Sequence, residues 1–405
     1  MSISVKGVEQ IPAEPGKVEE RRALGVACGA HALHDGYTDL IYVMLPIWQG
    51  EFGLAFAALG LMKTVFSGTL AAFQIPAGFL AERFGAVTVL TIGTVLAGLG
   101  YILAGFSAGM VLLVAALFIG GLGASTQHPL ASSLIAHAFA GPRSLKALGT
   151  YNFAGDIGKM TLPAAAALLL LILPWRQALM LLGGLGGVAA LAIFLTMPRF
   201  QDNAATVPKD HSAASSSVPA PGYAFPLLLS IGVIDSATRM AFLTFLPFVL
   251  AAKGASVQTI GMALTLVFAG GAVGKLVCAF IGARIGAVAT VWLTEVVTAL
   301  GIVVLLPLPL EAALLLLPVI GVALNGTSSV LYGSVPDLIE PTRRQRAFSI
   351  FYTGTIGAGA VSPALYGLLG DAVGVPTALL VIAAVVLVTL PIMLVLRPIL
   401  VARVS

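Results

Sequence analysis

Charged residues are scarce in this sequence. Only 9% of its 405 residues are Asp, Glu, Lys or Arg and 59% are hydrophobic, whereas roughly 25% of a soluble domain is charged. Together with a mean hydropathy of +1.03, this excludes an ordinary soluble protein and indicates a polytopic membrane protein. The net charge of +4 comes mainly from Lys and Arg between the apolar runs. No basic stretch interleaved with aromatic residues indicates a nucleic-acid partner.

Cysteine is rare, and the common catalytic motifs are missing. Cys28 and Cys278 each lie alone inside an apolar segment, which argues against a zinc site or a disulfide framework. No phosphate-binding loop of the form G-x-x-x-x-G-K-[ST] occurs, so any transport must be secondary, and we expect no cofactor. A hydrolase would need a catalytic triad, which Ser125, Ser132 and Ser133 lack. A sensor would need a larger soluble domain, so we expect neither an enzyme nor a sensor.

Long apolar runs fill most of the chain, and each can cross roughly 30 Å of hydrocarbon as a helix. They predict an all-α fold with twelve transmembrane helices, six on each side of a Ser-, Ala- and Pro-rich segment typical of a flexible linker. The expected organisation is an N-terminal tail at 1–22, a half at 23–198, the linker at 199–222, a half at 223–400 and a tail at 401–405. The runs lie at 23–48, 56–80, 86–107, 109–136, 145–172, 175–198, 223–252, 257–283, 286–308, 310–336, 345–369 and 375–400.

Basic residues predict the orientation of the chain. If the N-terminus is cytoplasmic, only Arg176 and Lys253 lie on the opposite side of the membrane. This strong positive-inside bias places both termini in the cytoplasm. The basic residues on the cytoplasmic side are then Lys6, Lys17, Arg21, Arg22, Arg83, Arg143, Lys146, Arg199, Lys209, Arg284, Arg343, Arg344, Arg346, Arg397 and Arg403.

The two halves repeat at a constant spacing of 201 residues. Leu45-Pro46 recurs as Leu246-Pro247, and Tyr151 recurs as Tyr352. The pentapeptide that begins at Arg83 (RFGAV) recurs as RIGAV. One offset shared by three distant places indicates duplication of a six-helix unit, an organisation known in secondary transporters.

The loop between the second and third runs reads G-F-L-A-E-R-F-G. It resembles the G-x-L-A-D-R-x-G signature of the major facilitator superfamily, with Glu82 in place of the usual Asp. The second copy keeps two of the four positions and has Ala283 at the acidic one. The resemblance implies two pseudo-symmetric halves, alternating access by a rocker-switch motion, and a central cavity lined by helices one, four, five, seven, eight and eleven. The residues that we expect in the gating loops are Gly78, Glu82, Arg83, Gly85, Arg284 and Gly286.

A second motif is similar to a narrower group. The fourth run contains Gln127-His128-Pro129-Leu130-Ala131-Ser132, which resembles the H-P-x-A-S stretch of fosmidomycin-resistance-type exporters. The His-x-x-His-Asp sequence of the first run shows a looser similarity. Both imply a proton-coupled exporter without fixing its substrate.

Polar residues form a stripe on the first run. His31, Asp35 and Asp39 are spaced by four and His34 lies beside them, so they share one helical face. An ionised Asp at the centre of a membrane helix costs roughly 2.5 to 3.5 kcal/mol, and such groups usually face a polar cavity. The alternative is that the stripe lies near the helix start, among lipid headgroups. We expect Asp35, Asp39, His34 and His128 to carry protons or cations.

Further charges lie inside the predicted spans: Lys63, Lys159, Arg239, Lys275, Asp156, Asp235 and Glu295. Asp235 and Arg239 are four residues apart, and Asp156 and Lys159 are three apart, so each pair could form a structural ion pair within its helix. Otherwise the cations could bind an anionic substrate, although Lys275 could instead extend to the membrane surface. The residues that we expect to bind substrate are Tyr37, Tyr151, Asn152, Asp156, Lys159, Asp235, Arg239, Lys275 and Asn325.

The sequence therefore predicts a monomeric transporter of a bacterial inner membrane, whose partners are the lipid bilayer, protons and a small polar or anionic substrate. One alternative keeps the fold and changes the cargo. Imidazole and carboxylate groups suit first-row metal ions, so a divalent metal ion could bind His31, His34, Asp35, Asp39 and His128.

Overall fold

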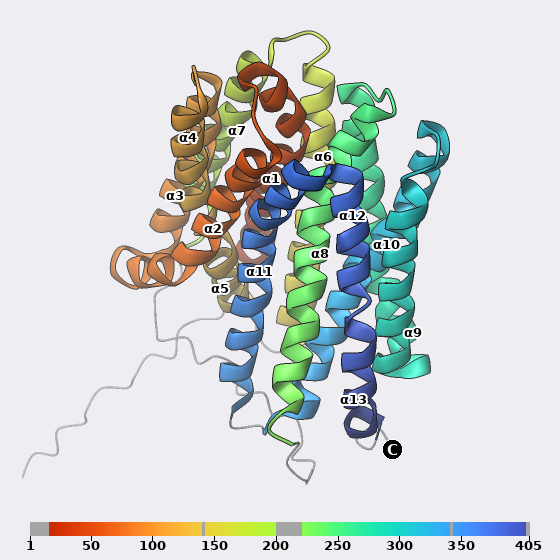
Figure 1. Ribbon diagram of the computed structural model, residues 1–405. Coiled ribbons are helices and arrows are strands. Elements are labelled where there is room, and N and C mark those ends of the chain that lie inside the picture. The colour runs from red at the N-terminus through yellow and green to blue at the C-terminus, as the bar shows by residue number, and fades with distance from the viewer. Residues whose placement is uncertain (1–15, 140–141, 200–220, 341–342, 402–405) are drawn as a thin grey trace, which may run out of the picture.

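The computed structural model describes residues 16–139, 142–199, 221–340 and 343–401. Within these residues the regular structure is helical, and the helices form one elongated bundle (Figure 1). In order they are α1 (Lys17–Phe52), α2 (Phe56–Phe84), α3 (Ala86–Gly105), α4 (Met110–Ala124), α5 (Gln127–Ala138), α6 (Pro142–Leu169), α7 (Trp175–Thr196), α8 (Ala224–Ala252), α9 (Val257–Leu305), α10 (Leu310–Leu338), α11 (Arg344–Val373), α12 (Val375–Val386) and α13 (Thr389–Val401).

The helices account for ten of the twelve expected membrane segments by length and hydropathy. Ten segments of the described chain are long and apolar enough to cross a membrane. The α4–α5 pair and the α12–α13 pair each form one such segment, whereas α9 contains two. The other two long helices, α1 and α6, pack along each other and carry Asp35, Asp39, Asp156 and Lys159. All-α architecture is thus confirmed, and the two helices outside the ten apolar segments carry four of the charged residues inside the bundle.

Glycine shapes the connection between neighbouring helices at equivalent places in the two halves. Gly85 between α2 and α3 has φ of 84°, and Gly286 inside α9 has φ of 83°. Side chains other than glycine rarely adopt this region. Gly286 interrupts the 49-residue α9 and separates its two spans. The two positions are one repeat apart, so the sequence repeat corresponds to the same backbone turn in both halves.

The first helix begins earlier than the sequence pattern indicates. Residues 17 to 22, expected in the polar tail, form the first turns of α1. Glu20 is buried there and its carboxylate lies 3.0 Å from the Arg143 guanidinium of α6. This contact explains how a polar segment is held in the bundle. Residues 1–15, most of the expected linker and residues 402–405 lie outside the described residues.

The two halves, α1–α7 and α8–α13, contact each other closely at one end of the bundle. We call this the upper end, because α13 and the C-terminus lie at the opposite, lower end in Figure 1. The Asp371 carboxylate of α11 accepts hydrogen bonds from the backbone N–H groups of Phe56 and Ala57, at 2.7 and 2.9 Å. The Gln258 side chain of α9 donates to the Ala167 carbonyl of α6 at 3.1 Å. These contacts close the upper end.

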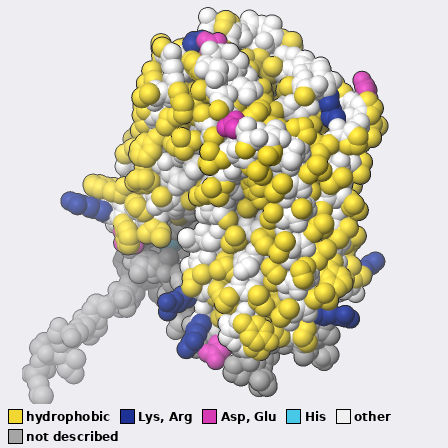
Figure 2. All heavy atoms as spheres, in the orientation of Figure 1, with side chains coloured by type: hydrophobic (Ala, Val, Ile, Leu, Met, Phe, Trp, Pro, Cys, Tyr) yellow, Lys and Arg dark blue, Asp and Glu magenta, His cyan; other side chains and the backbone are white. Residues whose placement is uncertain are grey.

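The outer face of the bundle is apolar. Figure 2 shows hydrophobic side chains over most of the visible face, with charged side chains mainly toward the upper and lower ends. This distribution matches a hydrocarbon environment bordered by two polar surfaces. The charges inside the bundle are therefore separated from lipid by this apolar layer.

Candidate functional site

A cavity of about 250 Å³ lies between the two halves. Helices of both halves contribute to it, including α1, α2, α5 and α6 from the first and α8, α9, α10 and α11 from the second. Its wall contains both acidic and basic side chains, which distinguishes it from the apolar core around it. The lining residues are Asp35, Thr38, Asp39, Ser67, Leu70, Gln74, His128, Lys159, Ser236, Arg239, Met240, Leu243, Phe268, Lys275, Asn325, Tyr352, Ile356, Gly359 and Ala360.

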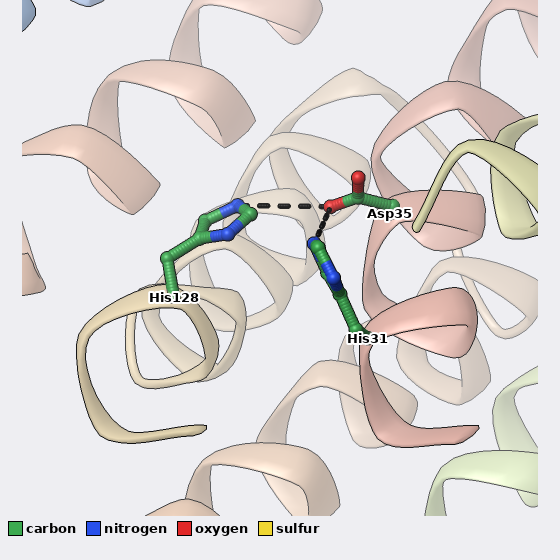
Figure 3. Close-up of side chains that lie close together, drawn as sticks. All are labelled: His31, Asp35 and His128. Atoms are coloured by element: carbon green, nitrogen blue, oxygen red, sulfur yellow. Dashed lines mark ion pairs between the residues drawn. The ribbon is translucent and has the colours of Figure 1, made fainter. Parts of the chain in front are cut away.

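Asp35 is the centre of the polar network. Its Oδ1 lies 3.4 Å from His31 Nε2 and 3.6 Å from His128 Nε2. Both imidazole rings point toward this carboxylate in Figure 3. Its Oδ2 lies 3.2 Å from the Lys159 ammonium. One carboxylate on α1 is therefore shared by two imidazoles and one ammonium group from three helices.

His31 is held in a fixed orientation. Its Nδ1 lies 2.8 Å from the backbone carbonyl of Tyr151, and the two rings stack with centroids 4.0 Å apart. Gly155, one turn further along α6, faces the same site. A Cβ at Gly155 would lie 2.7 Å from Asp35 Oδ2 and 2.8 Å from His31 Nε2. The absence of a side chain at Gly155 leaves room beside both groups.

Asp156 and Lys275 form another ion pair, and this one joins the two halves of the bundle. The Lys275 ammonium of α9 donates to both oxygens of the Asp156 carboxylate of α6, at 2.6 and 2.8 Å. Lys159 lies farther from Asp156, at 4.0 Å. The expected pair within α6 is thus present only as a long contact. Lys159 is closer to Asp35, and Asp156 is closer to Lys275.

Arg239 differs from Lys159 and Lys275 because it has no acidic partner within 4 Å among the residues that the structure describes. In the described part of the chain, no ion pair within 4 Å joins Arg239 to Asp235 or to another acid, although Asp235 is one turn away on α8. Arg239 lines the main cavity, and Asp235 is buried beside it around a smaller cavity of about 20 Å³. The structural pair considered for α8 is therefore not formed. The guanidinium is available to a bound anion.

Asp39 has its own partner. Lys63 of α2 is fully buried, lies 3.9 Å from Asp39 and donates to the Thr38 carbonyl at 2.6 Å. Its ammonium also lies 4.3 Å from the Tyr42 ring centroid. The sequence identified Lys63 as a charge inside a span but did not include it among the site residues. The only indication of its role in the sequence was a single Lys inside an apolar run.

Several residues expected in the site lie elsewhere. His34 Nε2 is 3.0 Å from the Thr94 hydroxyl, and the Tyr37 hydroxyl donates to the Leu182 carbonyl at 2.8 Å, so both contact α3 or α7 rather than the cavity. Asn152 is exposed on α6 and does not line the cavity. Tyr151 acts through His31, whereas Asn325 does line the cavity.

Five polar residues of the cavity were missing from the predicted set: Thr38, Ser67, Gln74, Ser236 and Tyr352. The repeat offered a signal for two of them, because Gln74 is equivalent to Lys275 and Tyr352 to Tyr151. Ser236 has no comparable signal in the sequence.

The five residues considered for a metal ion do not form one group. His34 contacts Thr94 and Asp39 is closest to Lys63. His31, Asp35 and His128 do come together, with potential ligand atoms within 4.8 Å of one another.

The gating loops lie in the connection between α2 and α3 and at the interruption of α9. Glu82, Arg83 and Arg284 are exposed. No ion pair of Glu82 is found among the described residues, and the Arg83 guanidinium lies 5.3 Å from the ring centroid of its neighbour Phe84. Neither Glu82 nor Arg83 thus joins α2 to another described helix by an ion pair in this conformation.

Comparison with known proteins identifies the family. The model of the Major Facilitator Superfamily matches residues 27–232 and again residues 227–403. The fosmidomycin resistance protein of Escherichia coli is 26% identical over 86% of each chain. A protein of Cupriavidus pinatubonensis described as a probable 4-methylmuconolactone transporter is 25% identical over 85% of this chain and 83% of its own. A probable sulfoacetate transporter of Cupriavidus necator is 30% identical over 42% of this chain and 40% of its own.

Solved structures share the fold. A bacterial homologue of the human lysosomal transporter Spinster, in an inward-facing and occupied conformation, has a TM-score of 0.80 at 15% identity, over 96% of this chain and 99% of that one. The nucleoside transporter NupG has a TM-score of 0.73 at 14% identity, over 93% and 98%. With two family matches that together span nearly the whole sequence, the chain belongs to the Major Facilitator Superfamily and is a secondary membrane transporter, not an enzyme.

Proposed function

We propose that this protein couples the movement of protons to the export of a small polar or anionic compound across a bacterial inner membrane. It would act as a monomer by alternating access, with the lower end of the bundle in the cytoplasm. The observation that carries the proposal is the shared carboxylate of Asp35, which lies within 4 Å of two imidazoles and one ammonium group. Such a group can exchange a proton for a cationic partner without leaving the cavity.

The cargo is inferred from the cations of the cavity. Arg239 forms no ion pair with a described acid, and Lys159 and Lys275 remain 31% and 38% exposed despite their acidic partners. A guanidinium is suited to bidentate binding of a carboxylate or phosphate. Sulfoacetate, the compound in the name of one relative, is an anion of this kind. We propose Arg239 as the principal anion contact.

The conformation supports a cytoplasmic opening. The upper end is closed by Asp371 and Gln258 contacts between the halves, so the cavity side chains that remain partly exposed are reached from below. The lower end also carries most basic residues of the loops, which favours its assignment to the cytoplasm. In this state the protein would receive its cargo from the cytoplasm, as an exporter requires.

The resemblance to exporters favours antiport, because two relatives are named for resistance and drug efflux. The contact between Lys159 and Asp35 supports a second candidate, proton symport of an anion. Protonation of Asp35 would release Lys159 to bind an anion, so proton and anion would bind together. The direction of proton movement separates the two candidates.

The test uses purified protein in liposomes that contain a pH-sensitive dye. Radiolabelled fosmidomycin, sulfoacetate and other small anions are screened first by counterflow. For a transported compound, an outward substrate gradient should acidify the lumen if the protein is an antiporter and alkalinise it if it is a symporter. A compound that exchanges without any change of pH would contradict proton coupling.

Asp35→Asn tests the proposed role of the carboxylate. We expect this variant to keep substrate counterflow and to lose substrate-driven proton movement. Glu51→Gln is the matched control, because Glu51 is an acid on the same helix whose partner is Arg176, outside the cavity. It should behave as wild type. If Asp35→Asn still moves protons with its substrate, the polar network is structural and another group couples transport.

A further inference from the structure

We propose that His31, Asp35 and His128 form a binding site for a first-row transition-metal cation such as Zn²⁺, reached from the cavity. The ion would be a ligand that occupies the polar network and not the transported cargo. The inference rests on the geometry of the three side chains and is independent of the substrate and of the direction of transport.

The two spacings between Asp35 and the imidazole nitrogens fit a small cation. Asp35 Oδ1 is 3.4 Å from His31 Nε2 and 3.6 Å from His128 Nε2. In a tetrahedral zinc site with bonds of about 2.0 to 2.1 Å, neighbouring ligand atoms are about 3.3 to 3.4 Å apart. Two imidazole nitrogens and one carboxylate oxygen are also a common ligand set for catalytic zinc, with a fourth position open to water. The cavity offers that open position.

The protonation of His31 supports the same conclusion. Its Nδ1 is 2.8 Å from the Tyr151 carbonyl, and a carbonyl oxygen can only accept, so Nδ1 carries the hydrogen. In the neutral ring Nε2 is then a bare acceptor, and it has no hydrogen-bond partner in the structure. It faces another acceptor, Asp35 Oδ1. Two acceptors in contact repel each other unless a second proton or a metal ion lies between them, and a carbonyl that fixes the other nitrogen is the usual outer partner of a metal-bound histidine.

The site is accessible and has room. The His128 side chain is 33% exposed and lines the cavity, which gives an ion a path of entry. Gly155 places no side chain against His31 and Asp35. The nearest positive charge, which would repel the ion, is Lys159, 3.2 Å from the other carboxylate oxygen, Oδ2. It leaves Oδ1 free for the ion but should weaken binding by electrostatic repulsion.

Co²⁺ is the probe for the test, because four-coordinate Co²⁺ absorbs visible light strongly and Zn²⁺ displaces it. The full-length protein is purified in detergent without a histidine tag and titrated. We expect one Co²⁺ per chain with the absorption of a four-coordinate ion, which Zn²⁺ abolishes. His128→Ala should weaken binding by at least tenfold, since even changes to outer partners cost about 10- to 100-fold.

His137→Ala is the matched control. His137 lies on the same helix, roughly 13 Å further along α5 at 1.5 Å per residue, and its Nδ1 is 2.8 Å from the Ser133 carbonyl. It should bind Co²⁺ as wild type does. Equal binding by wild type and His128→Ala, an equal loss in His137→Ala, or the absence of the four-coordinate spectrum would overturn the proposal.

The variant Lys159→Gln distinguishes a direct effect on metal binding from an indirect effect of misfolding. Removal of this ammonium group should tighten Co²⁺ binding severalfold, and an unfolded variant cannot produce a gain in affinity. Unchanged or weaker binding by Lys159→Gln would exclude an ion at Asp35. Because each readout is binding rather than transport, failure of this proposal would not affect the proposed function.

Discussion

Asp156 and Lys275 connect the halves through a single short ion pair, with Nζ to Oδ1 of 2.6 Å. The pair is asymmetric in its burial: the Asp156 side chain is 12% exposed and that of Lys275 is 38% exposed. The buried acid therefore depends on a cation supplied by the other half. A residue that links two moving units contributes both to stability and to the conformational equilibrium.

Replacement of Lys275 by Met should destabilise the protein, because Asp156 keeps only the 4.0 Å contact with Lys159. We expect a loss of about 1 to 2 kcal/mol, less than the roughly 3 to 5 kcal/mol of a fully buried pair, since Lys275 is partly exposed. The melting temperature in detergent measures the effect. The double variant Asp156→Asn/Lys275→Met should recover much of the loss. If its loss instead equals the sum of the losses of the two single variants, the two charges are not coupled.

The residues of the network could be identified from sequence, but not their pairing. Asp35, Asp39, Asp156 and Lys159 stand out as charges inside apolar runs. A separation of three residues allowed an ion pair between Lys159 and Asp156 as one of two alternatives, whereas the closer partner of Lys159 is Asp35. The reason lies in helix packing: a Cβ at Gly158 would collide with the Ala32 backbone. This close approach of α6 to α1, which a single sequence does not reveal, brings Lys159 within reach of Asp35.

At the scale of helices, the closure of the upper end depends on the contact between α2 and α11. The first N–H groups of a helix have no partner within it, and Asp371 of α11 accepts two of those of α2. Gly60 allows the two backbones to touch, because a Cβ there would overlap the Pro363 carbonyl. The negative carboxylate is also favourable at the positive end of the α2 dipole.

Asp371→Ala should favour opening of the upper end, since loss of a helix cap costs about 0.5 to 2 kcal/mol and this cap exists only when the halves meet. A single cysteine at Ala364, which lies against Gly60, reports the opening in a background that lacks Cys28 and Cys278. We expect faster reaction with a water-soluble thiol reagent.

Glu311→Ala serves as the control for this experiment. Glu311 is an acid in the first turn of α10, and none of the hydrogen bonds found among the described residues joins it to the first half. Its replacement should leave the labelling rate of the Ala364→Cys variant unchanged. Equal labelling in the Asp371 variant and in the parent would show that this cap does not control closure.

Helix positions were largely predictable, because each apolar run must satisfy its backbone hydrogen bonds internally. The interruptions were harder to locate. The structure separates α4 from α5 at Ser125 and Thr126, just before Pro129. Pro129 then lies in the first turn of α5, where its missing N–H leaves no hydrogen bond unmade. A proline can mark the region of such a break, but not its exact residues.

For the whole molecule, the repeat of 201 residues was the strongest predictor of architecture. It anticipated equivalent turns at Gly85 and Gly286, whose φ angles differ by one degree. Such symmetry determines that the two halves have similar folds, but not how far apart they lie in one conformation. The closed upper end could not be predicted, because it depends on contacts between residues such as Phe56 and Asp371 that are distant in sequence.

The orientation of the molecule in the membrane is testable as a whole. A green fluorescent protein fused after Ser405 should fluoresce in bacterial cells, because the fluorescent protein folds in the cytoplasm. Alkaline phosphatase, which is active only outside the cytoplasm, should be inactive at that position. The same enzyme inserted after Lys253, in the connection between α8 and α9 at the upper end, should be active. The reverse pattern would invert the assignment of the lower end.

The cavity between the halves has a consequence for the role of the solvent. Its volume of about 250 Å³ corresponds to roughly eight water molecules at about 30 Å³ each. A cargo that fills it must release most of them, so occupancy is linked to water activity as well as to cargo concentration. A solute too large to enter should therefore strengthen cargo binding as its osmotic pressure rises, and the slope of that dependence would count the waters released when the cargo binds.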